Sequence, residues 1–196
     1  GSGRRWWLAW IVLAFAVLTK GPVAVVLTGI TLVLFALIRR DLSGLWSSLR
    51  PLQGLLITGL ISLPWYAAEL LVEGQPFWDS FFGYHNLQRF TSVVNDHLQP
   101  WWFFGPVMLV AALPFTPFLL KGLIGVPRSR VEPEQSLQQF AVCWLLAVLI
   151  LFTSAATKLP SYWLPATPAS ALLVALATVK RDRLQTVAWW VSLGLT

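Results

Sequence analysis

The chain has 196 residues, of which 57% are hydrophobic and only 11% are charged, and its mean hydropathy is +0.69. A water-soluble domain of this size could not bury so much apolar surface, so the composition excludes a soluble globular protein and predicts a protein of the lipid bilayer. The single cysteine, Cys143, lies within an apolar run and excludes a disulfide framework inside the chain. The net charge is +6, so the positions of the basic residues are informative.

Successive apolar runs each predict a membrane helix, because backbone groups in lipid must satisfy their own hydrogen bonds and no alternating β-barrel pattern appears. The first two runs are short, so a helical hairpin is the alternative to two spans there. We expect an all-α, polytopic transmembrane helix bundle, with residues 1–196 forming one transmembrane region of about six spans and an incomplete seventh. In chain order the runs are Trp6–Thr19, Val23–Ile38, Leu52–Val72, Trp101–Leu120, Leu137–Thr153, Tyr162–Val179 and an incomplete run from Leu184.

Basic residues predict the orientation, because loops kept in the cytoplasm are enriched in Lys and Arg. If the N-terminal arginines are inside, alternating spans place nearly all other cations inside as well. The exceptions are Lys20, Arg89 and Lys158, each in a short polar motif beside a membrane helix. These three cations therefore mark the predicted functional face, on the outer side of the membrane.

The longest polar segment, residues 73–100, also falls on this outer side. Between Phe77 and Phe90 aromatic residues recur among polar ones, which is typical of an amphipathic helix lying in the membrane interface. We expect an outer-face interfacial loop and helix here.

Two motifs at predicted outer helix ends share a Thr-Lys pair followed by a proline. One is Thr19-Lys20-Gly21-Pro22 and the other is Thr157-Lys158-Leu159-Pro160. A single lysine at a helix end is usually an interfacial anchor. Two outer lysines are unusual for a membrane protein, and the pair therefore predicts a site for an anion.

The segment of residues 73–100 supplies a third cation. His85 and Arg89 are four residues apart and would share one face of a helix, and an Arg fork suits a phosphate. An interfacial helix whose polar side meets water is the plain alternative. His85 could also bind a metal, but no Cys or acidic residue at a recognised spacing accompanies it, so no cofactor is assigned and a divalent metal stays an open alternative.

The ordered motifs LAFAVLTKGPVAVVL, ISLPWY, FFGYHNLQRF, PWWFFGPVMLVAALPF and TKLPSYWLPATPASALLVA resemble those of a bacterial superfamily of membrane glycosyltransferases. These enzymes use polyprenyl-phosphate sugars, and they include the protein O-mannosyltransferases and the aminoarabinose transferases of lipid A. The resemblance implies that Lys20, Arg89, Lys158 and Tyr162 line the site of the carrier phosphate, and that His85 matches the histidine of the same family motif. It places the acidic catalytic residues in an outer loop N-terminal to this chain, so no catalytic residue is assigned here.

The resemblance implies transfer of a sugar from a polyprenyl-phosphate carrier to a lipid, glycan or protein acceptor, at the outer face of the bacterial inner (plasma) membrane. The expected partners are that carrier, the lipid bilayer and the acceptor, with no nucleic acid. A transporter or flippase of anionic polyprenyl lipids is the alternative, but it should carry repeat symmetry or ionisable groups near the bilayer midplane, and neither is evident. A purely structural subunit would leave the paired motifs unexplained. Because the chain begins with Gly1 and ends within an apolar run, we expect a fragment of a longer protein that is inactive alone.

Overall fold

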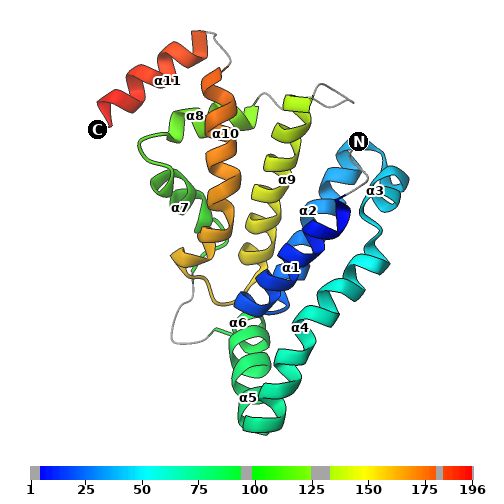
Figure 1. The fold of residues 1–196 in the computed structure, drawn as a ribbon. Helices are drawn as coiled ribbons and strands as arrows, with labels where there is room; N and C mark the ends of the chain where they lie inside the picture. The colour runs from blue at the N-terminus through cyan, green and yellow to red at the C-terminus, as the bar shows by residue number, and fades with distance from the viewer. Residues whose placement is uncertain (1–4, 94–98, 125–132, 180–182, 196) are drawn as a thin grey trace.

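The computed structural model describes residues 5–93, 99–124, 133–179 and 183–195. Helices make up the regular structure of these ranges, and they pack as a bundle (Figure 1). The predicted all-α membrane fold is confirmed.

The first half of the bundle contains two short apolar helices, a connecting helix and one long span. Its elements are α1 (Trp6–Lys20), α2 (Val23–Arg39), α3 (Leu42–Leu49) and α4 (Pro51–Glu73). Gly21, at φ 78°, and Pro22 separate α1 from α2, because glycine adopts this backbone conformation readily and proline has no N–H to continue the helix.

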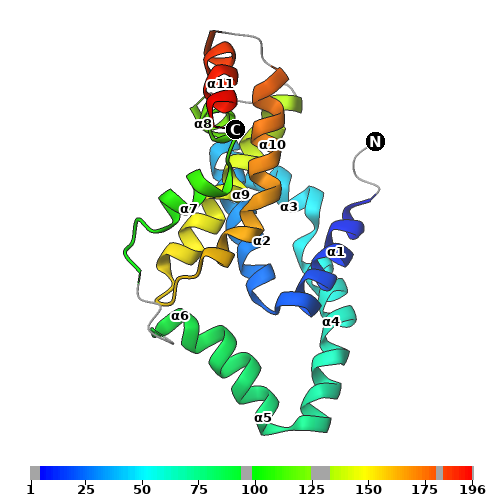
Figure 2. The same cartoon turned by 90° about the vertical axis from the view of Figure 1, so that its left-hand side faces the viewer.

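A helical arm follows α4, and the second half of the bundle follows the arm. The arm comprises α5 (Gln75–Phe77), the π-helix η2 (Trp78–Gln88) and α6 (Arg89–Thr91). Figure 2 shows this arm crossing below the bundle from the end of α4 toward the end of α9. The second half comprises α7 (Phe104–Ala111), α8 (Thr116–Ile124), α9 (Pro133–Ser154), the 3₁₀ helix η3 (Pro160–Ala166), α10 (Thr167–Val179) and α11 (Arg183–Gly194).

Among the described residues, three helical stretches are long and apolar enough to cross a membrane: Pro51–Glu73, Gln135–Ser154 and Pro160–Val179. The expected continuous helix over Trp101–Leu120 is instead two helices, α7 and α8, bent by 118°. Pro114 lies in the break, where a proline cannot donate a helical hydrogen bond. The pair is a broken span or a re-entrant loop, and the predicted number of spans stays a prediction.

Helix α1 packs along α4 through polar contacts as well as apolar ones. The indole N–H of Trp10 donates to the carbonyl of Leu49 at 2.8 Å, and the hydroxyl of Thr58 donates to the carbonyl of Trp10 at 3.0 Å. Gly54 lies directly under the Trp10 ring, where a Cβ atom would collide with it. Small residues and hydroxyl hydrogen bonds are the usual means by which helices associate within lipid.

The main apolar core lies between α8, α9, η3 and α10. Leu119, Leu145, Trp163 and Leu173 are among its buried side chains, and Gly122 allows α8 to approach the backbone of Leu173 closely. Helix α2 joins this half through Phe35, whose ring contacts Phe140 of α9 edge-on at 5.7 Å.

Charged residues separate to the two ends of the bundle. Figure 1 shows α3, α8 and the first turn of α9 at its upper end, which carries Arg39, Arg40, Arg50 and Lys121. The turn between α1 and α2, the arm, and the connection from α9 to η3 lie at the lower end. Both Thr-Lys motifs and Arg89 are thus at the same end. The arginines of residues 125–132 and 180–182 lie outside the described residues.

Candidate functional site

The connection from α9 to η3 presents Lys158. Helix α9 ends at Ser154, and Pro160 opens η3 as one of its first residues, a position where the missing N–H has no cost. The short stretch between them leaves the helical path, and the Lys158 side chain is only 9% exposed. Its ammonium group donates to the carbonyl of Ala155 at 2.9 Å, which satisfies one of its three donors.

Three hydrogen bonds join this connection to the end of the arm. The backbone N–H of Ala156 donates to the carbonyl of Phe90 at 2.9 Å, and that of Thr157 donates to the carbonyl of Arg89 at 3.1 Å. The Thr157 hydroxyl donates to the carbonyl of Ser92 at 2.9 Å. A helix leaves its last carbonyls without partners, and here the residues next to Lys158 supply them. This junction, formed by segments distant in the sequence, places the backbone of Arg89 beside Thr157, the residue before Lys158.

Arg89 lies half-buried at the junction with part of its hydrogen-bonding capacity unused. Its Nε is buried and has no hydrogen-bond partner, and its guanidinium lies over the ring of Tyr84, 5.5 Å from the ring centre. The backbone N–H of Arg89 also donates to the carbonyl of Tyr84. A buried donor without an acceptor is costly, at about 1–3 kcal/mol or more for a charged group. Such an arrangement fits a site that binds an anion.

Within the described residues, neither Arg89 nor Lys158 pairs with a carboxylate. Buried cations normally have an acidic partner, because removal from water is expensive. A buried cation and a half-buried one at the same junction therefore favour a ligand that carries negative charge.

Tyr162 lies in the first turn of η3, four residues after Lys158, and is half-buried. Its backbone N–H donates to the carbonyl of Leu159 at 3.0 Å, and its ring packs on Phe152 with ring centres 4.9 Å apart. The ring is fixed by this contact, and the structure gives its hydroxyl no hydrogen bond to another described residue.

Lys20 is placed differently from the other two cations. It is exposed at the last turn of α1, beside the apolar cluster that joins Val17 to Tyr66 and Phe77. Figures 1 and 2 place this turn at the same end as the junction, but no described contact links Lys20 to Arg89 or Lys158. Backbone hydrogen bonds join the segments that carry Arg89 and Lys158, whereas Lys20 lies at the edge of the same end.

The helix that carries His85 is a π-helix and not the expected α-helix. Its i→i+5 hydrogen bonds stack residue 89 over residue 84, which explains why Arg89 lies over Tyr84. The side chain of His85 lies outside the described residues. The described residues contain no group of three His, Cys, Asp or Glu side chains that could hold a metal.

Two features of the site were not predicted from sequence. One is Thr157, which the Thr-Lys motif presents only as the neighbour of Lys158, and which is 1% exposed and holds the junction. The other is Tyr84 beneath Arg89. The sequence does contain an indication of the role of Thr157, because a threonine at the end of an apolar helix must find hydrogen-bond partners.

No model of a protein family matches the chain. The chain is 35% identical to the undecaprenyl phosphate-alpha-4-amino-4-deoxy-L-arabinose arabinosyl transferase of Pseudomonas aeruginosa (strain UCBPP-PA14), over 94% of this chain and 33% of that protein. It is 34% identical to an uncharacterized protein of Aquifex aeolicus, over 90% of this chain and 39% of that one. The chain thus spans about a third of the length of these relatives.

The fold agrees with the sequence similarity. The crystal structure of ArnT from Cupriavidus metallidurans bound to undecaprenyl phosphate matches 96% of this chain and 32% of that one, with a TM-score of 0.77 and 28% identity. The same protein in the apo state matches with a TM-score of 0.73. The chain belongs to the superfamily of polyprenyl-phosphate-sugar-dependent membrane glycosyltransferases that includes these arabinosyl transferases.

Proposed function

We propose that this chain is part of a membrane glycosyltransferase, and that it supplies the groups that bind the phosphate of a polyprenyl-phosphate sugar. The full protein would move the sugar from this carrier to a lipid, glycan or protein acceptor at the outer face of the bacterial inner membrane. The Pseudomonas aeruginosa relative supports this proposal, since it is an undecaprenyl phosphate-alpha-4-amino-4-deoxy-L-arabinose arabinosyl transferase. One related structure contains undecaprenyl phosphate.

The observation that carries the proposal is the junction of Arg89 with Lys158. Lys158 is buried and Arg89 is half-buried, neither pairs with a carboxylate within the described residues, and the Nε of Arg89 has no acceptor. A phosphate would supply the missing charge and acceptors, and the planar guanidinium suits a phosphate with two parallel hydrogen bonds.

The same arrangement suits the chemistry of transfer. When the anomeric carbon leaves its carrier, negative charge develops on the departing phosphate. Cations that are already oriented in a water-poor site stabilise this charge more than exposed cations would. We assign this role to Arg89 and Lys158 and propose that Tyr162 donates its hydroxyl to the same phosphate. Lys20, at the edge of the same end, and His85 would complete the site.

The proposal is tested by the transfer of labelled sugar from its polyprenyl carrier by the full-length protein in membranes. Loss of a charge-assisted hydrogen bond costs about 1.5–3 kcal/mol, or roughly one to two decades in rate. Arg89→Ala, Lys158→Ala and Lys20→Ala should each fall by this amount at equal levels of folded protein. Arg89→Lys should recover only part of the loss, because lysine is a point charge where arginine is a fork.

A basic residue that the sequence predicts on the opposite side of the membrane provides the matched control. Arg128→Ala should leave transfer nearly unchanged, since it removes a cation outside the predicted site. Transfer at the wild-type rate by all three alanine variants of the outer cations would show that these residues are ordinary interfacial anchors, and the proposal would fail.

A further inference from the structure

Helix α3 lies where the chain turns between two apolar helices at the end of the bundle opposite the junction (Figure 1). Two residues separate it from α2, and after Arg50 it is followed by α4, which is long and apolar enough to cross a membrane. A connection this short between two membrane helices lies at the boundary of the bilayer. The helices α2 and α4 therefore determine how deeply α3 lies in the bilayer.

The exposed face of α3 is too apolar for a helix that meets only water. Leu42 and Trp46 are four residues apart, so they share a face, and they are 59% and 61% exposed. Leu45 and Leu49 lie half-buried on the inner side, and the serines of the helix are exposed. Tryptophan with leucine beside polar residues is the composition of a helix at a membrane interface.

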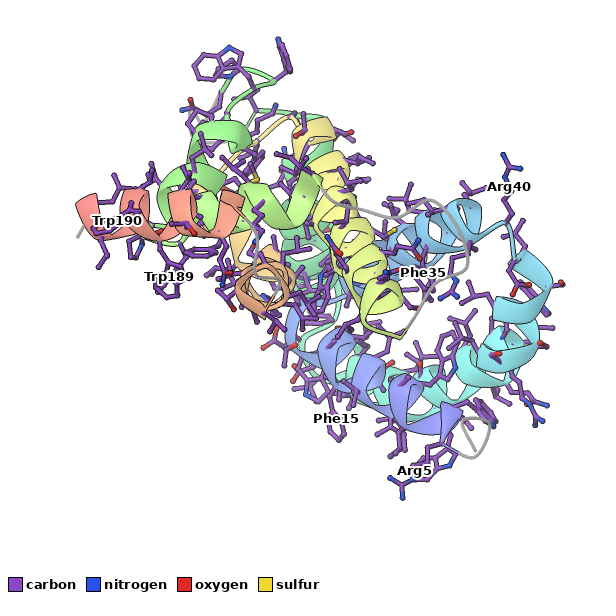
Figure 3. The ribbon with its side chains drawn as sticks, turned by 90° about the horizontal axis from the view of Figure 1, so that it is seen from above. Arg5, Phe15, Phe35, Arg40, Trp189 and Trp190 are labelled. Atoms are coloured by element: carbon purple, nitrogen blue, oxygen red, sulfur yellow. The ribbon has the colours of Figure 1, made fainter. Side chains whose placement is uncertain are left out.

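Two arginines bound this helix. Arg40 precedes its N-cap and Arg50 follows its last residue, and both are exposed. The guanidinium of Arg50 lies over the Trp6 ring at 5.5 Å. Figure 3 shows Arg40 pointing away from the bundle. Asp41 follows Arg40 and is the N-cap of α3, where its side chain accepts a hydrogen bond from the backbone N–H of Gly44 at 2.9 Å.

The backbone at both arginines is left-handed, with φ of 51° at Arg40 and 48° at Arg50. Glycine usually occupies such a position after a helix, because side chains with a Cβ atom are strained there. At both ends of α3 a charged residue stands where glycine would be less strained. Replacing either arginine by glycine would therefore remove the charge and keep the backbone conformation.

We propose that α3 binds anionic phospholipid headgroups, with Arg40 and Arg50 at the level of the phosphates and with Leu42 and Trp46 among the acyl chains. The charge of the two arginines favours an anionic lipid over a zwitterionic one, and the position of α3 at the bilayer boundary favours lipid over a soluble protein. This surface is separate from the carrier-phosphate site at the other end and does not depend on it.

The test is photocrosslinking from Trp46→p-benzoylphenylalanine in the full-length protein, reconstituted in vesicles of phosphatidylcholine mixed with phosphatidylglycerol. Crosslinks to phosphatidylglycerol should exceed its share of the vesicle. Since a basic residue near the surface contributes about 1 kcal/mol to the attraction of anionic lipid, the enrichment should fall roughly fivefold with Arg40→Gly and again with Arg50→Gly. Arg40→Lys is the matched control and should keep the enrichment.

The glycine variants also separate binding from folding. Glycine accepts the left-handed backbone, so the thermal unfolding midpoint of Arg40→Gly should stay the same or rise while the lipid preference falls. In Arg50→Gly the same gain offsets the lost contact with Trp6. Crosslinks that follow the bulk lipid ratio in the wild type, or an enrichment that survives in the double glycine variant, would overturn the proposal. Crosslinks mainly to another polypeptide would also overturn it and would assign this face to a protein partner.

Discussion

At the residue scale, the candidate site depends on a side chain that carries no charge. Thr157 is buried, and its hydroxyl and backbone N–H both donate to the end of the helical arm. Arg89 and Lys158 are 69 positions apart by their numbers, and the bonds of Thr157 and its neighbour Ala156 keep them adjacent. Thr157 is therefore a positioning residue for the proposed phosphate site.

Replacing Thr157 tests this role. Thr157→Val keeps the shape of the side chain but leaves the Ser92 carbonyl without its donor, at a cost of about 1–3 kcal/mol. We expect sugar transfer by the full-length protein to fall by about tenfold or more, whereas Thr157→Ser should retain most of the activity.

A double-mutant cycle separates positioning from general destabilisation. If Thr157 acts through Arg89, Thr157→Val should add little loss to the Arg89→Ala variant. Fully additive effects, or equal loss in Thr157→Ser, would contradict the positioning role.

At the scale of elements, the contact between α1 and α4 fixes the position of the α1–α2 turn and hence of Lys20. Trp10 fits over Gly54, and Tyr66 donates its hydroxyl to the carbonyl of Val17 at 2.6 Å near the lower end of the pair. Apolar packing alone discriminates poorly between helices in lipid, because lipid tails are as apolar as the side chains. Close approach at glycine and the hydrogen bonds supply the specificity.

This packing predicts a large difference between two glycine-to-alanine substitutions. Gly54→Ala forces the Trp10 ring to move and disturbs its hydrogen bond to Leu49, so it should destabilise the protein by about 1–3 kcal/mol. A Cβ atom at Gly29 of α2 meets nothing within 4 Å, so Gly29→Ala should be neutral or stabilising. Thermal unfolding in detergent measures both. Equal unfolding midpoints for the two variants would contradict the close packing of α1 on α4.

Hydropathy was sufficient to predict most helices but not their internal geometry. The apolar runs Trp6–Thr19, Val23–Ile38 and Leu52–Val72 agree with α1, α2 and α4 to within one residue at either end, because the same apolar residues that enter lipid must form helices there. The bend between α7 and α8 depends on local backbone geometry near Pro114, which hydropathy does not report. The π-helix was also missed, since it differs from an α-helix in its hydrogen bonds and not in composition.

The candidate site was predicted in its residue types but not in its arrangement. Charge on the unexpected side of the membrane singled out Lys20, Arg89 and Lys158. The union of Arg89 with Lys158 depends on hydrogen bonds between distant segments, and no local pattern encodes such bonds. For the same reason the more peripheral place of Lys20 could not be predicted.

At the scale of the whole molecule, the two ends of the bundle differ in their cations. The upper end in Figure 1 carries exposed arginines around α3, and the lower end carries the junction and the α1–α2 turn. The positive-inside rule predicts that the upper end faces the cytoplasm. The proposed carrier site then faces the outside.

Cysteine labelling tests this orientation, in a Cys143→Ala background. Gln75 in the arm and Ser48 in α3 are both exposed. A membrane-impermeant maleimide should label Gln75→Cys in intact cells, and it should label Ser48→Cys only after the membrane is permeabilised. Labelling of both positions from the same side would contradict the orientation and remove the basis for an outer site.

The measurement that tests the central claim most directly compares the binding of a polyprenyl phosphate with that of the polyprenol that lacks the phosphate, by the full-length protein in detergent or nanodiscs. The wild type should bind the phosphate form more tightly, and the Arg89→Ala/Lys158→Ala double variant should lose most of this preference, since each charge-assisted bond contributes about one to two decades of affinity. The double variant should bind the polyprenol as the wild type does. An undiminished preference for the phosphate form in the folded double variant would show that the carrier phosphate binds elsewhere.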